Sequence, residues 1–135
     1  MSWSSHDVLV AYRAAALNGD FSASVGGRMS IGDAPPRAAL PYAVLSVIDS
    51  VPFLDADADG AAMRVQVTII VAGDQGQNAA STIASQLRAN MSRSSLTVAG
   101  LNVLGVDYSI ERGPFRESEN WRVDADYIIR IREAA

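Results

Sequence analysis

The sequence predicts an α+β domain, in which a mainly antiparallel sheet of four strands carries two helices on one face. Three observations lead to this fold class. Residues 121–132 alternate apolar and polar side chains, as a strand with one buried face does. Residues 80–91 carry apolar side chains at helical spacing. The strand-like segments come in two pairs with short connections, which favours antiparallel pairing and the order α-β-β-α-β-β.

The first predicted element is a helix that begins after Ser4. Ser4 has the chemistry of an N-cap, and Asp7 lies at the reciprocal position of a capping box. Trp3 and Val8 have the spacing of a hydrophobic staple. Gly19 is placed to end this helix in a left-handed conformation.

The next segments predict a long connection followed by a strand pair. Residues 22–39 are rich in Gly, Ser and Pro, and a short strand at residues 28–31 is left open. Residues 42–49 are apolar on both faces, which predicts a strand buried on both sides. After a turn at residues 55–60, residues 63–72 alternate as the antiparallel partner strand.

The second half repeats the order of one helix and two strands. Asp74 and Gln77 have capping-box spacing at the start of the helix. Its apolar stripe consists of Ala80, Ile83, Ala84, Leu87 and Met91. Two further strands are predicted at residues 101–112 and 121–132, and residues 113–120 are predicted to form a polar loop between them.

Composition narrows the function classes. The chain of 135 residues is 49% hydrophobic and 19% charged, so we expect one folded domain spanning residues 1–135. It has no cysteine and a single histidine, His6, which excludes thiolate chemistry and leaves no histidine pair for a metal. A net charge of −4 gives no basic field for nucleic acid. We therefore expect no enzyme, no catalytic residue, no metal and no cofactor.

The sequence also predicts no targeting or membrane segment. The N-terminus lacks the pattern of a signal peptide. The longest apolar runs, near residues 43–48 and 67–72, are far shorter than the ~20 residues that span a bilayer. We expect a soluble protein that stays where it is made or joins an assembly there.

An acidic turn resembles the opening of a calcium-binding loop. Asp55, Asp57 and Asp59 alternate before Gly60, as in an EF-hand. The position that needs a bidentate Glu is occupied by Gln66, inside a predicted strand. A solvated β-turn is therefore the preferred interpretation, and a calcium site remains the alternative.

Two other polar groups are candidates for function. Asp124 and Asp126 share a strand face with Arg122, which we interpret as an ion-paired, solvated face with cross-strand partners such as Arg112. The predicted loop at residues 113–120 is longer than a tight hairpin needs, which suggests contact with a partner. The candidate interface residues are Arg112, Phe115, Arg116, Glu117 and Glu119.

One stretch of the chain resembles a known family. The segments Gly26-Gly27-Arg28-Met29, Ala34-Pro35 and Pro41-Tyr42-Ala43-Val44 are similar to the pattern of tail completion, or tail terminator, proteins of long-tailed bacteriophages and gene transfer agents. The order of elements is similar over nearly the whole chain. The acidic turn at residues 55–60 departs from the family's pattern.

The resemblance implies a virion structural protein without enzymatic activity. It implies a homo-oligomeric ring, a hexamer, at the head-proximal end of the tail, assembled in the bacterial cytoplasm. Such a ring terminates polymerisation of the tail tube and provides the head-tail joining surface. Its partners are the tail tube protein and a connector or neck protein, and DNA passes through the lumen without specific binding. The alternatives are a neck, head-completion or tail tube protein and, in another class, a small calcium- or ligand-binding module.

Overall fold

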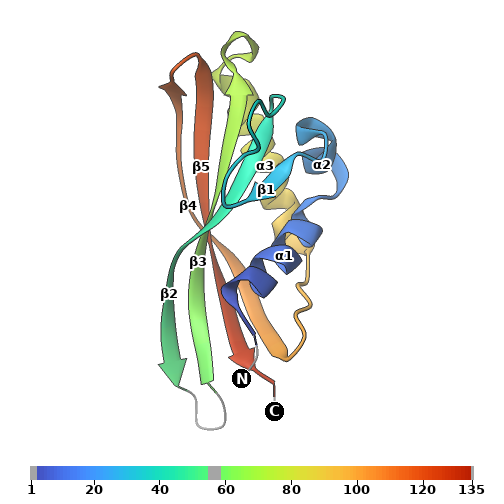
Figure 1. Ribbon diagram of the computed structural model, residues 1–135, viewed down its shortest axis with the longest axis vertical. Coiled ribbons are helices and arrows are strands. Elements are labelled where there is room, and N and C mark those ends of the chain that lie inside the picture. The colour runs from blue at the N-terminus through green and yellow to red at the C-terminus, as the bar shows by residue number, and fades with distance from the viewer. Residues whose placement is uncertain (1–2, 55–58, 135) are drawn as a thin grey trace.

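A five-stranded sheet with helices on one side is the main feature of the computed structural model, which describes residues 3–54 and 59–134 (Figure 1). The elements are α1 (Ser5–Ala16), α2 (Gly19–Val25), β1 (Met29–Ile31), β2 (Tyr42–Leu54), β3 (Asp59–Ala72), the 3₁₀ helix η1 (Gly73–Gln75), α3 (Gln77–Arg93), β4 (Leu101–Glu117) and β5 (Asn120–Glu133). The strand order is β1-β2-β3-β5-β4. All neighbours are antiparallel except β1 and β2. The α+β class is confirmed, but the predicted four strands and two helices are not.

The additional elements, α2 and β1, lie in the region predicted as a long connection. Gly19, with φ of 53°, begins α2 and does not end α1. Only Phe21 and Val25 of this short helix are buried, which is too little periodicity to recognise from the sequence. β1 adds to the edge of the sheet by pairing Met29 with Ala43 of β2. The short strand considered at residues 28–31 is therefore present as β1.

The two predicted capping boxes have different outcomes. At α1 the box is confirmed: the Asp7 amide donates to Ser4 Oγ at 3.3 Å, and the Ser4 amide donates to Asp7 Oδ2 at 3.0 Å. At α3 it is wrong, because Asp74 lies in η1 and Gly76 occupies the N-cap position without a side-chain bond. The apolar stripe of α3 is confirmed, since all of its residues are buried: Ala80, Ile83, Ala84, Leu87 and Met91.

The first strand pair is longer than predicted. β2 continues to Leu54 and β3 begins at Asp59, so the acidic connection is shorter than expected. The calcium alternative rests on Asp55, Asp57 and Asp59, and the first two of these lie outside the described residues. Within residues 3–54 and 59–134, no group of three potential ligands could hold a metal ion.

β2 is buried on one face, and the prediction of burial on both faces is wrong. Ala43 and Leu45 are inaccessible, whereas Tyr42 and Val44 are half-buried and Ile48 is 46% exposed. The helices account for this difference because they cover a single face of the sheet (Figure 1).

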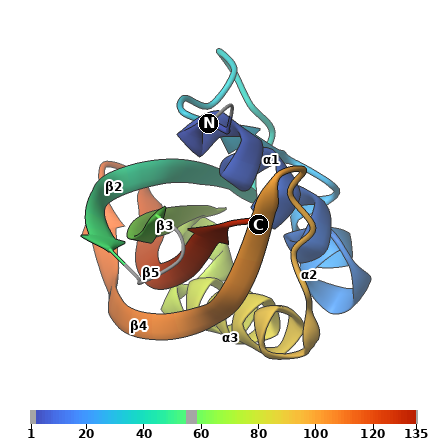
Figure 2. The same cartoon turned by 90° about the horizontal axis from the view of Figure 1, so that it is seen from below.

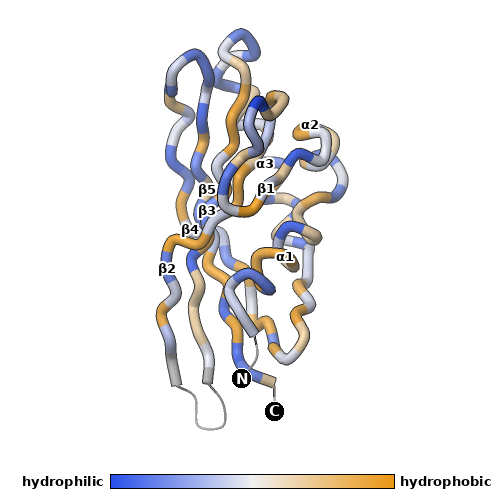
Figure 3. Tube along the Cα trace, in the orientation of Figure 1, coloured by the Kyte–Doolittle hydropathy of each residue, from blue (hydrophilic) through white to orange (hydrophobic). Residues whose placement is uncertain are grey.

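The core lies between the sheet and two helices. α3 contacts β3, β4 and β5, while α1 contacts β1 and β2. Viewed along the strands, the sheet is strongly coiled, and the long strands β2 and β4 flank β3 and β5 (Figure 2). β5 contributes the longest alternating set of buried apolar residues: Val123, Ala125, Tyr127, Ile129 and Ile131. The β4–β5 turn and the connection between β3 and α3, at the top of the view in Figure 3, are hydrophilic. None of the described helices is long and apolar enough to cross a membrane.

Val123→Asp and Ile129→Asp should each unfold the protein. Both side chains are inaccessible, so the new carboxylate would be buried without a partner, at a cost of roughly 4 kcal/mol or more. Val10→Asp is the matched control, because Val10 on α1 is 48% exposed. Thermal melting followed by circular dichroism tests the expectation. Melting of both core variants at the wild-type temperature would refute the assignment of this face to the core.

Two buried tyrosines have hydroxyl groups without partners. Tyr12 and Tyr127 are at most 1% exposed, and their rings lie 5.7 Å apart between α1 and β5. Neither hydroxyl oxygen has a hydrogen-bond partner in the described part of the chain. Burial raises the pKa of Tyr12 well above its ordinary value, and burial also raises the pKa of Tyr127. Both tyrosines therefore stay neutral in the folded state at a pH where the unfolded chain loses the proton.

This difference predicts a loss of stability in alkali. Above pH ~10 the unfolded state binds fewer protons than the folded state, so each tyrosine lowers the stability by up to ~1.4 kcal/mol per pH unit. Tyr127→Phe should make the alkaline decline less steep, and at pH 7 it should maintain or raise stability, because it removes an unpaired buried hydroxyl. Urea unfolding at pH 7 to 11 measures both effects. The control is Tyr42→Phe, at a half-buried residue, and an equal effect of the two variants would contradict the explanation.

Candidate interaction surface

The β4–β5 hairpin occupies the region predicted as a polar loop. β4 continues to Glu117 and β5 begins at Asn120, so only Ser118 and Glu119 form the turn. The loop predicted at residues 113–120 is therefore wrong. A register shift between Arg112 and Phe115 interrupts the alternation of β4, and this hides the end of the strand from sequence reading.

Buried ion pairs lie on the sheet face opposite the helices. Asp126 accepts hydrogen bonds from Arg112 Nη1 and Nη2, at 3.2 and 3.1 Å, and from Gln66 Nε2 at 3.2 Å. Asp124 accepts from Arg122 Nε and Nη2, at 2.8 and 3.1 Å. It also accepts from Thr68 Oγ1 at 3.0 Å. The predicted pairing of these carboxylates with arginines is confirmed.

The predicted solvation of this face is wrong, because Asp124 and Asp126 are only 6% and 2% exposed. The side chains that bind the two carboxylates also lie over them, and they come from β3, β4 and β5, which the sequence does not show. On the same face a hollow of about 370 Å³ is lined by segments that are distant in sequence. They are residues 32–34, Tyr42, Val44 and Ser46 of β2, Thr68 and Ile70 of β3, and Glu117 and Arg122 of the hairpin.

Arg122 connects the buried carboxylates to the end of the hairpin. Its Nη1 donates to Glu117 Oε1 at 2.9 Å, and its guanidinium lies 5.6 Å from the ring centroid of Phe115. The hydrogen bond to Asp124 is the largest of the effects that raise the pKa of Arg122. We call the set Gln66, Thr68, Arg112, Phe115, Glu117, Arg122, Asp124 and Asp126 the outer-face network.

The five candidate interface residues divide between the two faces of the hairpin. Arg112, Phe115 and Glu117 belong to the outer-face network, and Glu119 lies in the turn. Arg116 lies on the opposite face, with its guanidinium 5.1 Å from the ring centroid of Trp121. All five are exposed. The sequence analysis did not identify Arg122 as the partner of Phe115 and Glu117, because it predicts residues 113–120 as a loop and not as paired strand.

The hairpin is also held from the side by η1. A Cβ at Gly73 would collide with the carbonyl oxygen of Glu119 and lie 3.1 Å from Arg116 Nη2. The absence of a side chain at Gly73 therefore allows η1 to lie against the Ser118–Glu119 turn. The end of the hairpin is thus supported from both faces, which limits the conformations open to its exposed side chains.

The Gly-Gly-Arg motif has a structural role. Gly26 and Gly27 have φ of 60° and 72°, which suits the end of α2. Arg28 Nε donates to the carbonyls of Ala39 and Pro41, both at 3.0 Å. This contact holds the connection between β1 and β2 at the start of β2.

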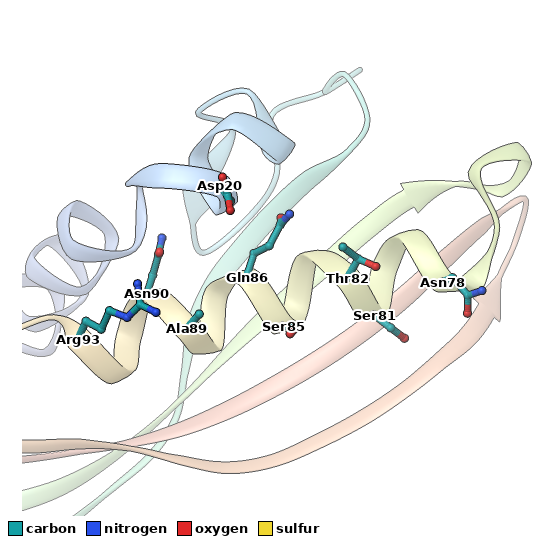
Figure 4. A pocket seen from close by; sticks show the side chains of 9 residues that line it. All are labelled: Asp20, Asn78, Ser81, Thr82, Ser85, Gln86, Ala89, Asn90 and Arg93. Carbon is teal, nitrogen blue, oxygen red and sulfur yellow. The ribbon is translucent and has the colours of Figure 1, made fainter.

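Another hollow, of about 670 Å³, lies along α3 and the start of α2 (Figure 4). Its lining is polar and mostly uncharged: Asp20, Asn78, Ser81, Thr82, Ser85, Gln86, Ala89, Asn90 and Arg93. Asn90 Nδ2 donates to the carbonyls of Ala16 and Asn18, and Gln86 Oε1 accepts from Ser24 Oγ. These amides attach α2 to α3, so their role is structural.

The outer-face network predicts a large difference between two arginines. Arg122→Met would leave Asp124 buried without its cation, at a cost of about 3–5 kcal/mol. Arg130→Met, which breaks the exposed pair with Asp107, should cost about 0–1 kcal/mol. Asp124→Asn in the Arg122→Met background should recover much of the loss. Urea unfolding of the three variants measures these differences, and equal costs for the two single variants would contradict the buried pair.

Comparisons with known proteins cover most of the chain. The sequence model of the family described as tail completion protein gp17 matches residues 12–132. Among curated proteins, no sequence matches the chain. The fold is similar to that of a chain in the solved virion of a native gene transfer agent particle, with a TM-score of 0.77 and 19% sequence identity. The similarity covers 95% of this chain and 99% of that chain. The chain therefore belongs to the family of tail completion protein gp17 and is a structural protein of a virion tail.

Proposed function

We propose that this protein forms a homo-oligomeric ring, a hexamer, at the head-proximal end of the tail tube. The ring would end polymerisation of the tube and provide the surface that joins tail to head. The match of the tail completion family to residues 12–132 carries the proposal. The fold shared with a chain of a gene transfer agent virion supports it.

The end of the β4–β5 hairpin is the surface that we assign to the tube protein or to the connector. Phe115 is 39% exposed and is held from behind by Arg122. Arg116 and Glu119 add charge on the other face and in the turn. An aromatic anchor whose position is already fixed loses little entropy on binding, and the surrounding charges can define the partner's orientation.

Charge supports passage of DNA without specific binding. The chain has a net charge of −4 and no lysine. Three of its arginines are occupied in four ion pairs: Arg112, Arg122 and Arg130 bind carboxylates on the sheet, and Arg122 also binds Glu117 at the hairpin.

The polar groups of the described chain also fit a structural role better than catalysis. Each buried carboxylate is bound by a guanidinium and by a neutral donor, from Thr68 or Gln66. An acid–base pair would need a proton that can be exchanged with a substrate. We therefore propose that the protein has no enzymatic activity and needs no cofactor.

A hairpin variant tests the assignment of the partner surface. Phe115→Ala combined with Arg116→Ala should leave the protein folded and oligomeric, because both side chains are exposed on β4. Particles assembled with this variant should have tails of abnormal length or tails unjoined to heads. Negative-stain electron microscopy of tail lengths and joined particles provides the measurement.

The control is Val10→Ala, which shortens an exposed apolar side chain on α1. Normal tails and normal joining with the double variant would show that the hairpin end is not the partner surface. Sedimentation of the wild-type protein tests the ring separately, since a ring sediments as a closed oligomer and an isolated binding module as a monomer.

A further inference from the structure

The exposed apolar side chains of the chain follow the borders of the sheet. Among the large hydrophobic side chains described as exposed, only Val10 lies outside β2 and β4. The others are Ile48 and Val51 on β2 and Leu104, Tyr108, Ile110 and Phe115 on β4. β2 and β4 lie on opposite sides of the molecule in its lower half (Figure 1). The protein therefore presents two separate apolar borders.

Both borders are open to another chain. β1 pairs with residues 43–45 of β2, so the rest of β2 has β3 as its sole partner strand. β4 forms the other end of the strand order and pairs with β5 alone. Long open edges that carry apolar side chains are typical of surfaces that another chain covers.

A β-bulge displays a large aliphatic side chain on each border. The pairing of β2 with β3 shifts between Val47 and Asp49, which leaves Ile48 as the additional residue. The pairing of β4 with β5 shifts between Val103 and Gly105, which leaves Leu104 as the additional residue. Ile48 is 46% exposed and Leu104 is 49% exposed. Because bulges redirect side chains, both residues are turned out of the regular pattern of the sheet.

The apolar residues of the two borders lie at matching levels across the sheet. One row of paired residues runs from Val51 through β3 and β5 to Gly105, the neighbour of Leu104. Another row runs from Val47, the neighbour of Ile48, to Tyr108. β2 and β4 run in opposite directions, so a second copy placed beside the first would bring its β4 antiparallel to β2. Val51 would then meet Leu104, and Ile48 would meet Tyr108.

The charges between these two rows compensate each other. Of the two rows between them, one begins at Asp49 and ends at Asp107. Asp107 is paired with Arg130. Arg64 lies beside Asp49 in the same row and has no ion pair within the described part of the chain. A contact between the borders would therefore combine two carboxylates with two guanidinium groups.

We propose that the free part of β2 in one copy binds β4 of the next copy, with Ile48 and Val51 against Tyr108 and Leu104. The contact is made by side chains, because Pro52 lacks an amide donor and the bulges of β4 interrupt its backbone pattern. Two different borders make a heterologous contact, which closes into a ring when the rotation between copies divides a full turn. This inference rests on the proposed ring and identifies its contact surfaces.

The absence of cysteine from the sequence allows a direct test by crosslinking. In Val51→Cys/Leu104→Cys the two thiols lie on opposite borders with two strands between them, so a disulfide has to join different copies. Mild oxidation with diamide should give a ladder of covalent oligomers on a non-reducing gel. The matched control is Val10→Cys/Leu104→Cys, which has one thiol on α1 and should run as a monomer on the same non-reducing gel. Dimers from Val51→Cys alone would overturn the proposal, because they would mean that two β2 borders meet.

Aspartate variants test the same contact without a covalent bond. Val51→Asp and Leu104→Asp should each keep the circular dichroism spectrum of the wild type, because both side chains are exposed, and each should be monomeric in analytical ultracentrifugation. An equal mixture should form dimers, since each variant retains the border that the other lacks. A wild-type ring that persists in both variants and gives no cysteine ladder would overturn the border assignment and leave the ring standing. A wild type that is monomeric, with no ladder, would overturn the ring as well.

Discussion

The pairing of β5 with β3 and β4 is the constraint on which the rest of the structure depends. One face of β5 contributes inaccessible residues to the core beneath the helices. Its other face carries Asp124 and Asp126, which are also buried. A shift of one residue would move the apolar side chains to the open face and the carboxylates into the core. Both faces of β5 therefore specify the same register, and the hairpin and the two borders take their positions from it.

Buried carboxylates on a face without helices require counter-charges from nearby strands. Arg112 of β4 binds Asp126, and Arg122 of β5 binds Asp124. Because removing a buried ion from water costs several kcal/mol, these pairs do more to define geometry than to add stability. Their effect reaches the hairpin end through Glu117 and Phe115, which both contact Arg122. In a tail completion protein, a hairpin with fixed side chains is suited to recognising one partner in one orientation.

The sheet combines a closed interior with open borders. The face that the helices cover is buried and apolar. At the borders, β2 and β4 expose apolar side chains, where an isolated domain would normally expose polar ones. Pro52 and the bulges of β4 prevent these borders from adding strands without limit. Such a domain would associate through side chains at defined positions, as the proposed ring requires, and would not polymerise as a continuous sheet.

The sequence alone determined the elements whose patterns are long and local. The alternation of β5, the apolar stripe of α3 and the Ser4–Asp7 capping box all appear in the structure, because each depends on neighbouring residues in the chain. The tertiary structure alone decided the features that depend on distant partners. It placed β1 beside β2, extended β4 through the bulge before Phe115, and buried Asp124 among side chains of neighbouring strands. Periodicity reports which residues share a face, whereas the partner and the solvent of that face are fixed by segments far away in the sequence.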